Sequence, residues 1–264
     1  MSSEDTEPVS TDAIILAGGR AHDELARLTG TPVRALFPFR GKPFVQWVYE
    51  AIRAVPGIGR IAVVGPVEHL RNVPHVAEAS LLVPERDSME ANLFASIAEL
   101  LPQGRLLAAA CDNPLVTSEA YRDFLARCPP DAGVCYPVLE YGAFLAEFPG
   151  AANIPVRLRD GLFIGGDCVL FACRAIPRIQ TAIRQVAAAR KSLWRMVNLL
   201  GWPFTLRFVM RLATSNEVER RASAIAGVPV RFVRNCHPAF AVDIDDPDDW
   251  RYLTRWDLRQ RSSR

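Results

Sequence analysis

The chain has 264 residues, of which 50% are hydrophobic and 23% charged, which suits one large α/β domain with a sizeable core. Its formal net charge is only +2, which argues against a general polyanion-binding surface and against nucleic acid as the main partner. Residues 1–12 are polar and acidic, without the basic start and apolar run of a signal peptide, so we expect a disordered tail on a cytoplasmic protein.

The first apolar run ends abruptly in two glycines and an arginine. Residues 13–17 are Ala-Ile-Ile-Leu-Ala, followed by Gly18, Gly19 and Arg20. This pattern predicts a buried parallel strand that opens into a loop, where backbone N–H groups and Arg20 could hold phosphates. The alternative is that the glycines merely turn the chain after a core strand. Neither a P-loop nor a dinucleotide-binding fingerprint is present in the sequence.

Strand and helix patterns alternate through the first half of the chain. The segment 21–39, which includes Arg34, is too long for a tight turn, and its length predicts a loop that covers the site. Apolar spacing predicts helices over 41–52, 88–101 and 118–127 and buried strands over 61–65, 80–84 and 106–110. The alternation predicts a doubly wound, mostly parallel sheet with its site at the carboxyl ends of the strands.

The second half is less regular. Asp160-Gly161 suggests a hairpin, and Gly165-Gly166-Asp167 a second loop of close approach. We expect strands over 133–139, 228–233 and 240–245, and helices over 175–190, over 215–226 and after Asp246-Pro247. The apolar segment 193–212 contains several arginines, and we interpret it as part of a helical subdomain covering the acceptor side. The alternative is a helix pair with weak membrane-surface contact.

One domain over residues 13–258 accounts for these elements, with a helical insert at about 190–226 and a C-terminal tail over 259–264. Its acidic residues could bind a divalent cation. Asp112 follows the fourth strand at the expected ligand-binding edge, and Asp243 and Asp245 share one face of the expected last strand. Carboxylate oxygens at these positions are suitable Mg²⁺ ligands. The nearby Asp246, Asp248 and Asp249 are better placed to stabilise the N-terminus of the following helix.

Four ordered blocks resemble the signature of GT-A-like nucleotidyltransferases, such as molybdenum cofactor guanylyltransferases and sugar-phosphate uridylyltransferases. They are Leu-Ala-Gly-Gly-Arg (16–20), the segment 37–45, Asp-Asn-Pro-Leu (112–115) and the segment 242–250. The resemblance covers about residues 13–250 and is weakest between 140 and 235. It implies a Rossmann-like GT-A fold and a Mg²⁺-dependent transfer of NMP from an NTP to a phosphorylated small molecule, with release of pyrophosphate.

The resemblance also implies roles for individual residues. Catalysis would fall to Arg20, Arg34 and Asp112, and acceptor binding to Gly166 and Asp167. The implied metal ligands are Asp112, Asp243 and Asp245, and the implied nucleotide-binding residues are Leu16, Ala17, Gly18, Gly19, Arg20 and Asn92.

The chain departs from the family pattern at two of these positions. Arg34 stands where Lys is usual, which keeps the charge but changes its geometry. Asp167 stands where relatives tend to carry Asn, which would add negative charge near the acceptor. That charge disfavours a bare anionic group directly beside it and would suit a hydroxyl-rich or cationic acceptor. Two alternatives follow: a glycosyltransferase, for which Asp243-x-Asp245 matches a D-x-D pattern, and a non-catalytic nucleotide-binding relative. The base, the acceptor and the oligomeric state stay open.

Overall fold

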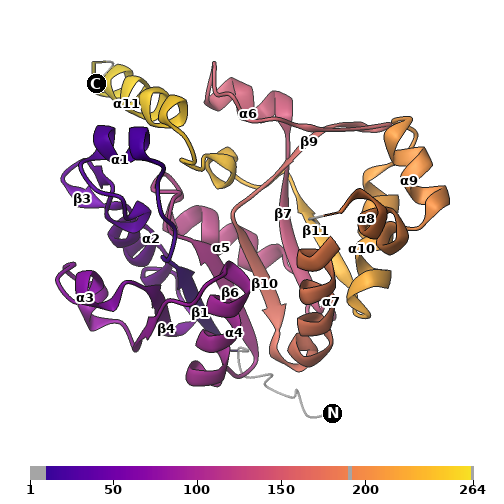
Figure 1. Cartoon of the computed structure of the whole chain (residues 1–264), viewed down its shortest axis with the longest axis horizontal. Helices are drawn as coiled ribbons and strands as arrows, with labels where there is room; N and C mark the ends of the chain where they lie inside the picture. Colours follow the sequence, from indigo (N-terminus) through magenta and orange to yellow (C-terminus); the bar gives the residue numbers. More distant parts are fainter. Residues whose placement is uncertain (1–9, 190–191, 263–264) are drawn as a thin grey trace, which may run out of the picture.

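The structure is a computed structural model that describes residues 10–189 and 192–262 (Figure 1). At its centre lies a nine-stranded mixed sheet in the order β5-β4-β1-β6-β10-β7-β9-β8, with β11 paired to β7. The strands are β1 Thr11–Leu16, β4 Ile58–Gly65, β5 Leu81–Pro84, β6 Arg105–Ala110, β7 Val134–Glu140, β8 Val156–Leu158, β9 Gly161–Gly165, β10 Cys168–Ala172 and β11 Val230–Arg234. Strands β5, β4, β1 and β6 are parallel, whereas β10 is antiparallel to both neighbours. The predicted α/β class is confirmed.

Helices cover both faces of this sheet. The longer ones are α2 Phe44–Arg53, α4 Met89–Leu100, α5 Ser118–Arg127, α7 Ile176–Ala189, α10 Ser215–Ala226 and α11 Pro247–Ser262. The shorter ones are α1 Asp23–Thr29, α3 Val67–Leu70, α6 Tyr141–Glu147, α8 Leu193–Leu200 and α9 Trp202–Val209. A small hairpin of β2 (Pro38–Phe39) and β3 (Lys42–Pro43) and the 3₁₀ turns η1 (Arg34–Leu36), η2 (Val76–Glu78), η3 (Cys173–Ala175) and η4 (Pro238–Ala241) complete the chain. No helix of the described residues is both long enough and apolar enough to cross a membrane.

The alternation of side chains along each strand divides the core in two. On β1, Ala13 and Ile15 pack with residues of α2 and α5, whereas Ile14 packs with residues of α4 and α7. Because successive residues of a strand point to opposite faces, a strand buried on both faces is apolar throughout. We call the side covered by α2 and α5 the aromatic face, since it holds most of the large buried rings. We call the side covered by α4, α7 and α10 the open face.

The helical region lies at one end of the molecule. In Figure 1, α8, α9 and α10 (orange) are on the opposite side from α1, α2 and α3 (indigo to purple). Helix α10 has the predicted bounds and begins with a capping box, in which Thr214 and Glu217 exchange side-chain and backbone hydrogen bonds. These helices lie within the predicted insert, beside the last strands of the sheet.

Three expected boundaries differ in the structure. Strand β1 begins at Thr11, inside the expected tail, because the Asp12 carboxylate accepts a hydrogen bond from the Arg60 backbone N–H at 2.9 Å and pairs with the Arg60 guanidinium. Residues 1–9 lie outside the described part. At the other end, α11 continues to Ser262 instead of giving way to a tail at 259. The predicted helix 175–190 is α7, and Arg190 lies outside the described residues.

Two segments have a different secondary structure from the one that we predicted. The predicted loop over 21–39 contains α1, which ends at Gly30 with a φ of 77°, and η1. The predicted last strand over 240–245 is instead the turn η4 followed by irregular chain. Pro238 starts this turn, and the Phe240 ring packs edge-on against Tyr121 and Phe124 at centroid distances of 5.3 and 5.8 Å. The apolar run is therefore explained by ring packing and not by strand pairing.

Candidate active site

The glycine loop follows β1 at the carboxyl edge of the sheet, as predicted. A Cβ added to Gly18 would lie 2.7 Å from the Asn92 side-chain nitrogen, and one added to Gly19 would lie 3.1 Å from the Arg34 side chain. A side chain at either position would require the Asn92 or Arg34 side chain to move. Glycine at these two positions therefore lets Leu16, Ala17 and the loop approach Asn92 and Arg34.

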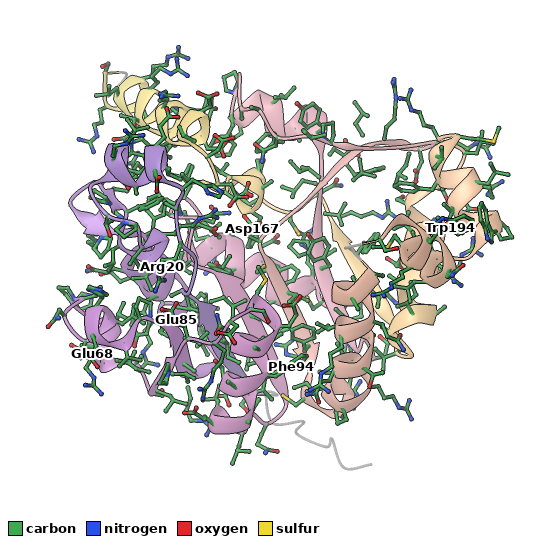
Figure 2. The ribbon with its side chains drawn as sticks, viewed as in Figure 1. Arg20, Glu68, Glu85, Phe94, Asp167 and Trp194 are labelled. Atoms are coloured by element: carbon green, nitrogen blue, oxygen red, sulfur yellow. The ribbon has the colours of Figure 1, made fainter. Side chains whose placement is uncertain are left out.

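Arg20 lies at the outer end of this loop and pairs with Glu85. Its guanidinium donates to a Glu85 carboxylate oxygen at 3.0 Å and to the Gly18 carbonyl at 3.3 Å. Figure 2 shows Arg20 and Glu85 side by side, with Asp167 at the same edge. Glu85 was missed in the sequence, although it directly follows β5 and so lies at the carboxyl edge. The Arg20 charge is thus balanced by Glu85.

Asn92 is buried at the beginning of α4, where Ser88 caps the helix. Its side-chain oxygen accepts a hydrogen bond from the Arg86 backbone N–H, which orders the segment between β5 and α4. The structure therefore brings Asn92 together with Gly18, as the nucleotide-binding assignment requires. Gly18 follows β1, and Asn92 lies in the helix that follows β5, with β4 between these two strands.

Arg34 lies between two of the carboxylates assigned to the metal. Its guanidinium is 3.6 Å from the Asp112 carboxylate and forms a shorter ion pair with Asp245. The Arg34 and Asp112 side chains are only 19% and 17% exposed, whereas Asp245 is 58% exposed. A buried guanidinium held by an exposed carboxylate can exchange that partner for a phosphate oxygen.

Four carboxylates in this part of the site, those of Asp112, Asp167, Asp243 and Asp245, influence one another's charge. Burial raises the pKa of Asp112, reinforced by the negative charge of Asp245 and opposed by Arg34. Burial and the charges of Asp245 and Asp112 raise the pKa of Asp243 to about 6. Burial, with the charges of Asp243 and Asp112, also raises the pKa of Asp167 well above its usual range. Carboxylates that repel each other in this way favour a cation between them.

Two asparagines support the cluster. Asn113 is buried and donates to the Asp167 carboxylate at 3.1 Å. Asn153 donates to the Ala241 carbonyl at 2.8 Å and to the Asp243 carboxylate at 3.1 Å. Asn153 was missed in the sequence, since an Asn in a loop carries no local signal of this contact. Its hydrogen bonds hold the chain around Asp243 in place of the strand pairing that we expected.

The acceptor loop Gly166-Asp167 is fixed on both sides by backbone hydrogen bonds. The Asp167 carbonyl accepts from the Ala110 N–H and its N–H donates to the Phe240 carbonyl, both at 2.9 Å. A Cβ on Gly166 would lie 2.8 Å from the Phe240 Cβ, so glycine permits this approach. The loop therefore joins the end of β6 to the segment that carries Asp243.

The donor set fits a hard divalent cation. Asp112 Oδ1 and Asn113 Oδ1 are buried and have no hydrogen-bond partner among the described residues. Oxygen atoms of this kind are the ligands that Mg²⁺ prefers. Across residues 10–189 and 192–262, however, no three His, Cys, Asp or Glu side chains are already arranged as a metal-binding group. Arg34 occupies the position between Asp112 and Asp245 instead.

The aspartates of the α11 N-terminus behave as predicted, with Asp246 and Asp249 accepting backbone N–H groups.

A family model described as a MobA-like NTP transferase domain matches residues 13–202 of the chain. Among solved structures, a hypothetical transferase from Thermus thermophilus is 32% identical with a TM-score of 0.81, covering 91% of this chain and 99% of its own. No curated protein matches the chain.

Two more distant structures share the fold alone. A 4-diphosphocytidyl-2C-methyl-D-erythritol synthase from Anaerococcus prevotii is 11% identical with a TM-score of 0.59, over 94% of this chain and 96% of its own. A CMP:2-keto-3-deoxy-manno-octonic acid synthetase in complex with CTP is 13% identical with a TM-score of 0.56, over 95% and 99%.

Proposed function

The chain belongs to the MobA-like NTP transferase family, and from that premise we propose that it transfers NMP from an NTP to a phosphorylated small molecule in a Mg²⁺-dependent reaction. The observation that carries this proposal is the cluster of Asp112, Asp243, Asp245 and Arg34 beside the glycine loop. Such a cluster provides carboxylate oxygens that could bind a cation and a guanidinium that could bind a phosphate group of the NTP.

The reaction would need no protein nucleophile. An oxygen of the acceptor phosphate forms a bond to the α-phosphorus of the NTP, and the bond from that phosphorus to the pyrophosphate oxygen breaks. Catalysis then consists of positioning and of neutralising charge as it develops. The glycine loop would hold the triphosphate by its backbone N–H groups, and Asn92 would order the adjoining segment.

Arg34 would stabilise the α-phosphate. In the structure its guanidinium is paired with the exposed Asp245, and a phosphate oxygen can replace that carboxylate. Asp112 and Asp243 would hold Mg²⁺, with Asn113 and Asn153 positioning the carboxylates around them. The cation, when bound, supplies positive charge to the phosphate oxygens. Gly166 and Asp167 would contact the acceptor.

Substitution of Asp112 tests the assignment directly. We expect Asp112→Asn to lower the rate of pyrophosphate release at least about 100-fold, because it removes charge from the cation site. Asp131→Asn is the matched control, since Asp131 is an exposed carboxylate away from the site. Equal rates for both variants would contradict the metal assignment.

A thermal-shift screen against ATP, GTP, CTP, UTP and dTTP, with and without Mg²⁺, would identify the base. Ligand at about 100 times its dissociation constant stabilises a protein by about 2.7 kcal/mol, which is a shift of several degrees. We expect one NTP to stabilise the protein, and only with Mg²⁺. Stabilisation by a sugar nucleotide alone would favour the glycosyltransferase alternative. Stabilisation by an NTP without any pyrophosphate release would favour the non-catalytic one.

A further inference from the structure

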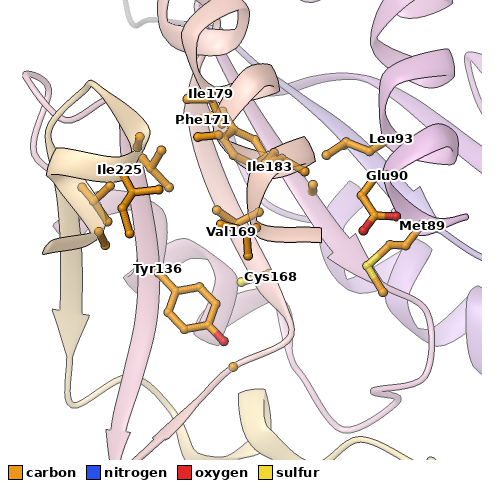
Figure 3. A pocket seen from close by; sticks show the side chains of 18 of the residues that line it. Met89, Glu90, Leu93, Tyr136, Cys168, Val169, Phe171, Ile179, Ile183 and Ile225 are labelled. Atoms are coloured by element: carbon orange, nitrogen blue, oxygen red, sulfur yellow. The ribbon is translucent and has the colours of Figure 1, made fainter. Parts of the chain in front are cut away.

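The open face of the sheet contains a cavity of about 700 Å³. Its floor is formed by β6 and β10, and its walls by α4, α7 and α10. Figure 3 shows Leu93 of α4 on one side, Ile225 of α10 on the other, and Val169, Ile179 and Ile183 between them. Cavities that bind small molecules have volumes of about 300 to 1,000 Å³. The volume is therefore that of a ligand site and well beyond a packing defect.

Small side chains create this space. Ala108 of β6, Ala182 of α7 and Ala222 and Ala226 of α10 all line the cavity. An apolar cavity lowers stability in proportion to its volume, so larger residues at these positions would stabilise a protein that had no use for the space. The lining is mostly apolar, with the rings of Tyr136, Phe171 and Phe204 among aliphatic side chains, and its charged members are Glu90, Asp167 and Arg221. The Arg221 guanidinium donates to the Leu199 carbonyl at 2.6 Å.

The cavity reaches the catalytic edge of the sheet. Leu16, which begins the glycine loop, and the acceptor loop Gly166-Asp167 both contribute to its lining, as do Met89 and Glu90 at the start of α4. A molecule whose phosphate lies beside Arg34 and Asp112 would thus direct the rest of its length past Gly166-Asp167 and under α7. Water gains few hydrogen bonds on such an apolar surface, whereas hydrocarbon is favoured there.

We propose that the acceptor is an amphipathic phosphate whose long aliphatic chain fills this cavity. The proposal rests on the proposed function, because it assumes that the phosphate end reacts beside Asp112 and Arg34. The outer wall of the cavity supports it: Leu200 of α8 and Phe204 of α9 line the cavity, and the same two helices expose Trp194 and Trp202. The segment 193–212 carries arginines and no acidic residue, so its charge favours the approach of anionic amphiphiles.

Binding of n-alkyl phosphates to the purified protein tests the proposal without catalysis. Titration calorimetry with butyl, octyl and dodecyl phosphate, each below its micelle concentration, should show affinity rising up to about fourfold per methylene, the factor that corresponds to about 0.8 kcal/mol. Inorganic phosphate is the reference for the head group alone. Equal affinity for butyl and dodecyl phosphate would overturn the proposal.

Filling the cavity should abolish the dependence on chain length. We expect Ala222→Phe to bind butyl phosphate as the wild type does but to lose at least tenfold in affinity for dodecyl phosphate. Ala224→Phe is the matched control, because Ala224 is exposed on the same helix. Ala226→Leu, a smaller change at another lining position, serves if Ala222→Phe does not fold. Unchanged dodecyl phosphate binding in a folded, filled variant would overturn the proposal.

Two further measurements identify the class of aliphatic chain and separate this proposal from the proposed function. Geranyl and decyl phosphate have equal carbon numbers, so tighter binding of one assigns a prenyl or a straight acyl-type chain. Chain-dependent binding together with no pyrophosphate release from any NTP would overturn the proposed function and leave the cavity assignment standing. Pyrophosphate release with short acceptors, together with binding that does not depend on the length of the alkyl chain, would overturn the cavity assignment and leave the proposed function standing.

Discussion

The two faces of the central sheet use the same strands in opposite ways. On the aromatic face, Tyr121, Phe124 and Phe240 are almost completely buried and pack edge to face. On the open face, alanines of β6, α7 and α10 leave a cavity of about 700 Å³. Close packing on the aromatic face fixes Phe240, whose carbonyl accepts a hydrogen bond from Asp167 at the edge of the sheet. The other face is then free to hold a ligand.

Phe240 connects the aromatic face to the site, because its carbonyl accepts the Asp167 N–H while its ring lies between Tyr121 and Phe124. Phe240→Ala should lower the free energy of unfolding by about 3–5 kcal/mol, since it removes a buried ring from a close-packed core. Urea unfolding followed by circular dichroism measures this loss. A loss below about 1 kcal/mol would mean that the aromatic face is not close-packed.

Truncation of a side chain on the open face should lower the free energy of unfolding by less. Ile183 is only partly buried because one side of it faces the cavity. We expect Ile183→Ala to lower the free energy of unfolding by about 1–2 kcal/mol, below the usual range for a fully buried isoleucine. Measured in the same urea series, a loss equal to that of Phe240→Ala would remove the distinction between the faces.

The attachment of α10, which forms one wall of the cavity, depends on Asp160. Burial alone would raise the pKa of Asp160, but hydrogen bonds from the Ser215 hydroxyl and backbone N–H outweigh it and lower the pKa. A lowered folded-state pKa means that the stabilisation is present above the unfolded value of about 3.9 and is lost as the pH falls through the folded value. Asp160→Ala should therefore lower the free energy of unfolding by about 1 kcal/mol at pH 7, and by less below about pH 4.

Thermal or urea unfolding at several pH values measures this difference between the variant and the wild type. A difference that stayed constant down to pH 3 would show that the ionised carboxylate is not what holds α10.

The exposed tryptophans of α8 and α9 should change stability least. Trp194 and Trp202 are 67% and 59% exposed and contact each other with their ring centroids 5.6 Å apart. Replacing both with Ser should change the free energy of unfolding by no more than about 1 kcal/mol. We propose that these rings contact lipid, so the double variant should co-sediment less with anionic vesicles. Leu258→Ser, at an equally exposed apolar residue of α11, is the control, and equal losses would exclude a specific surface.

Much of the nucleotide-side architecture could be predicted from local patterns. Apolar runs that end in glycine or aspartate identified β1 with its loop and β6 with Asp112, because strand ends and close approaches depend on neighbouring residues. The turn at 238–241 could not be predicted, since its apolar residues contact rings of α5 that are distant in sequence. The ion pair of Arg34 with Asp245 could not be predicted either, because the two residues are distant in sequence.

The cavity could not be predicted for a related reason. Ala108 and Ala222 are ordinary residues in their own strand and helix, and a void appears only when both face the same space. Residue volume has no periodic signal along a chain, whereas hydrophobicity does. The assignments of Mg²⁺ ligands, nucleotide contacts and acceptor contacts to individual residues stay predictions, although the structure brings those residues to one edge.

The ion pair between Arg34 and Asp245 joins residues that are 211 positions apart in the chain. A contact of such long range closes a large loop, which costs conformational entropy. During synthesis, β1, its glycine loop and α4 leave the ribosome long before Asp243 and Asp245 do. A nascent chain can therefore order its first strands while the acidic half of the site is still missing, and the catalytic edge is completed only by the last elements to emerge.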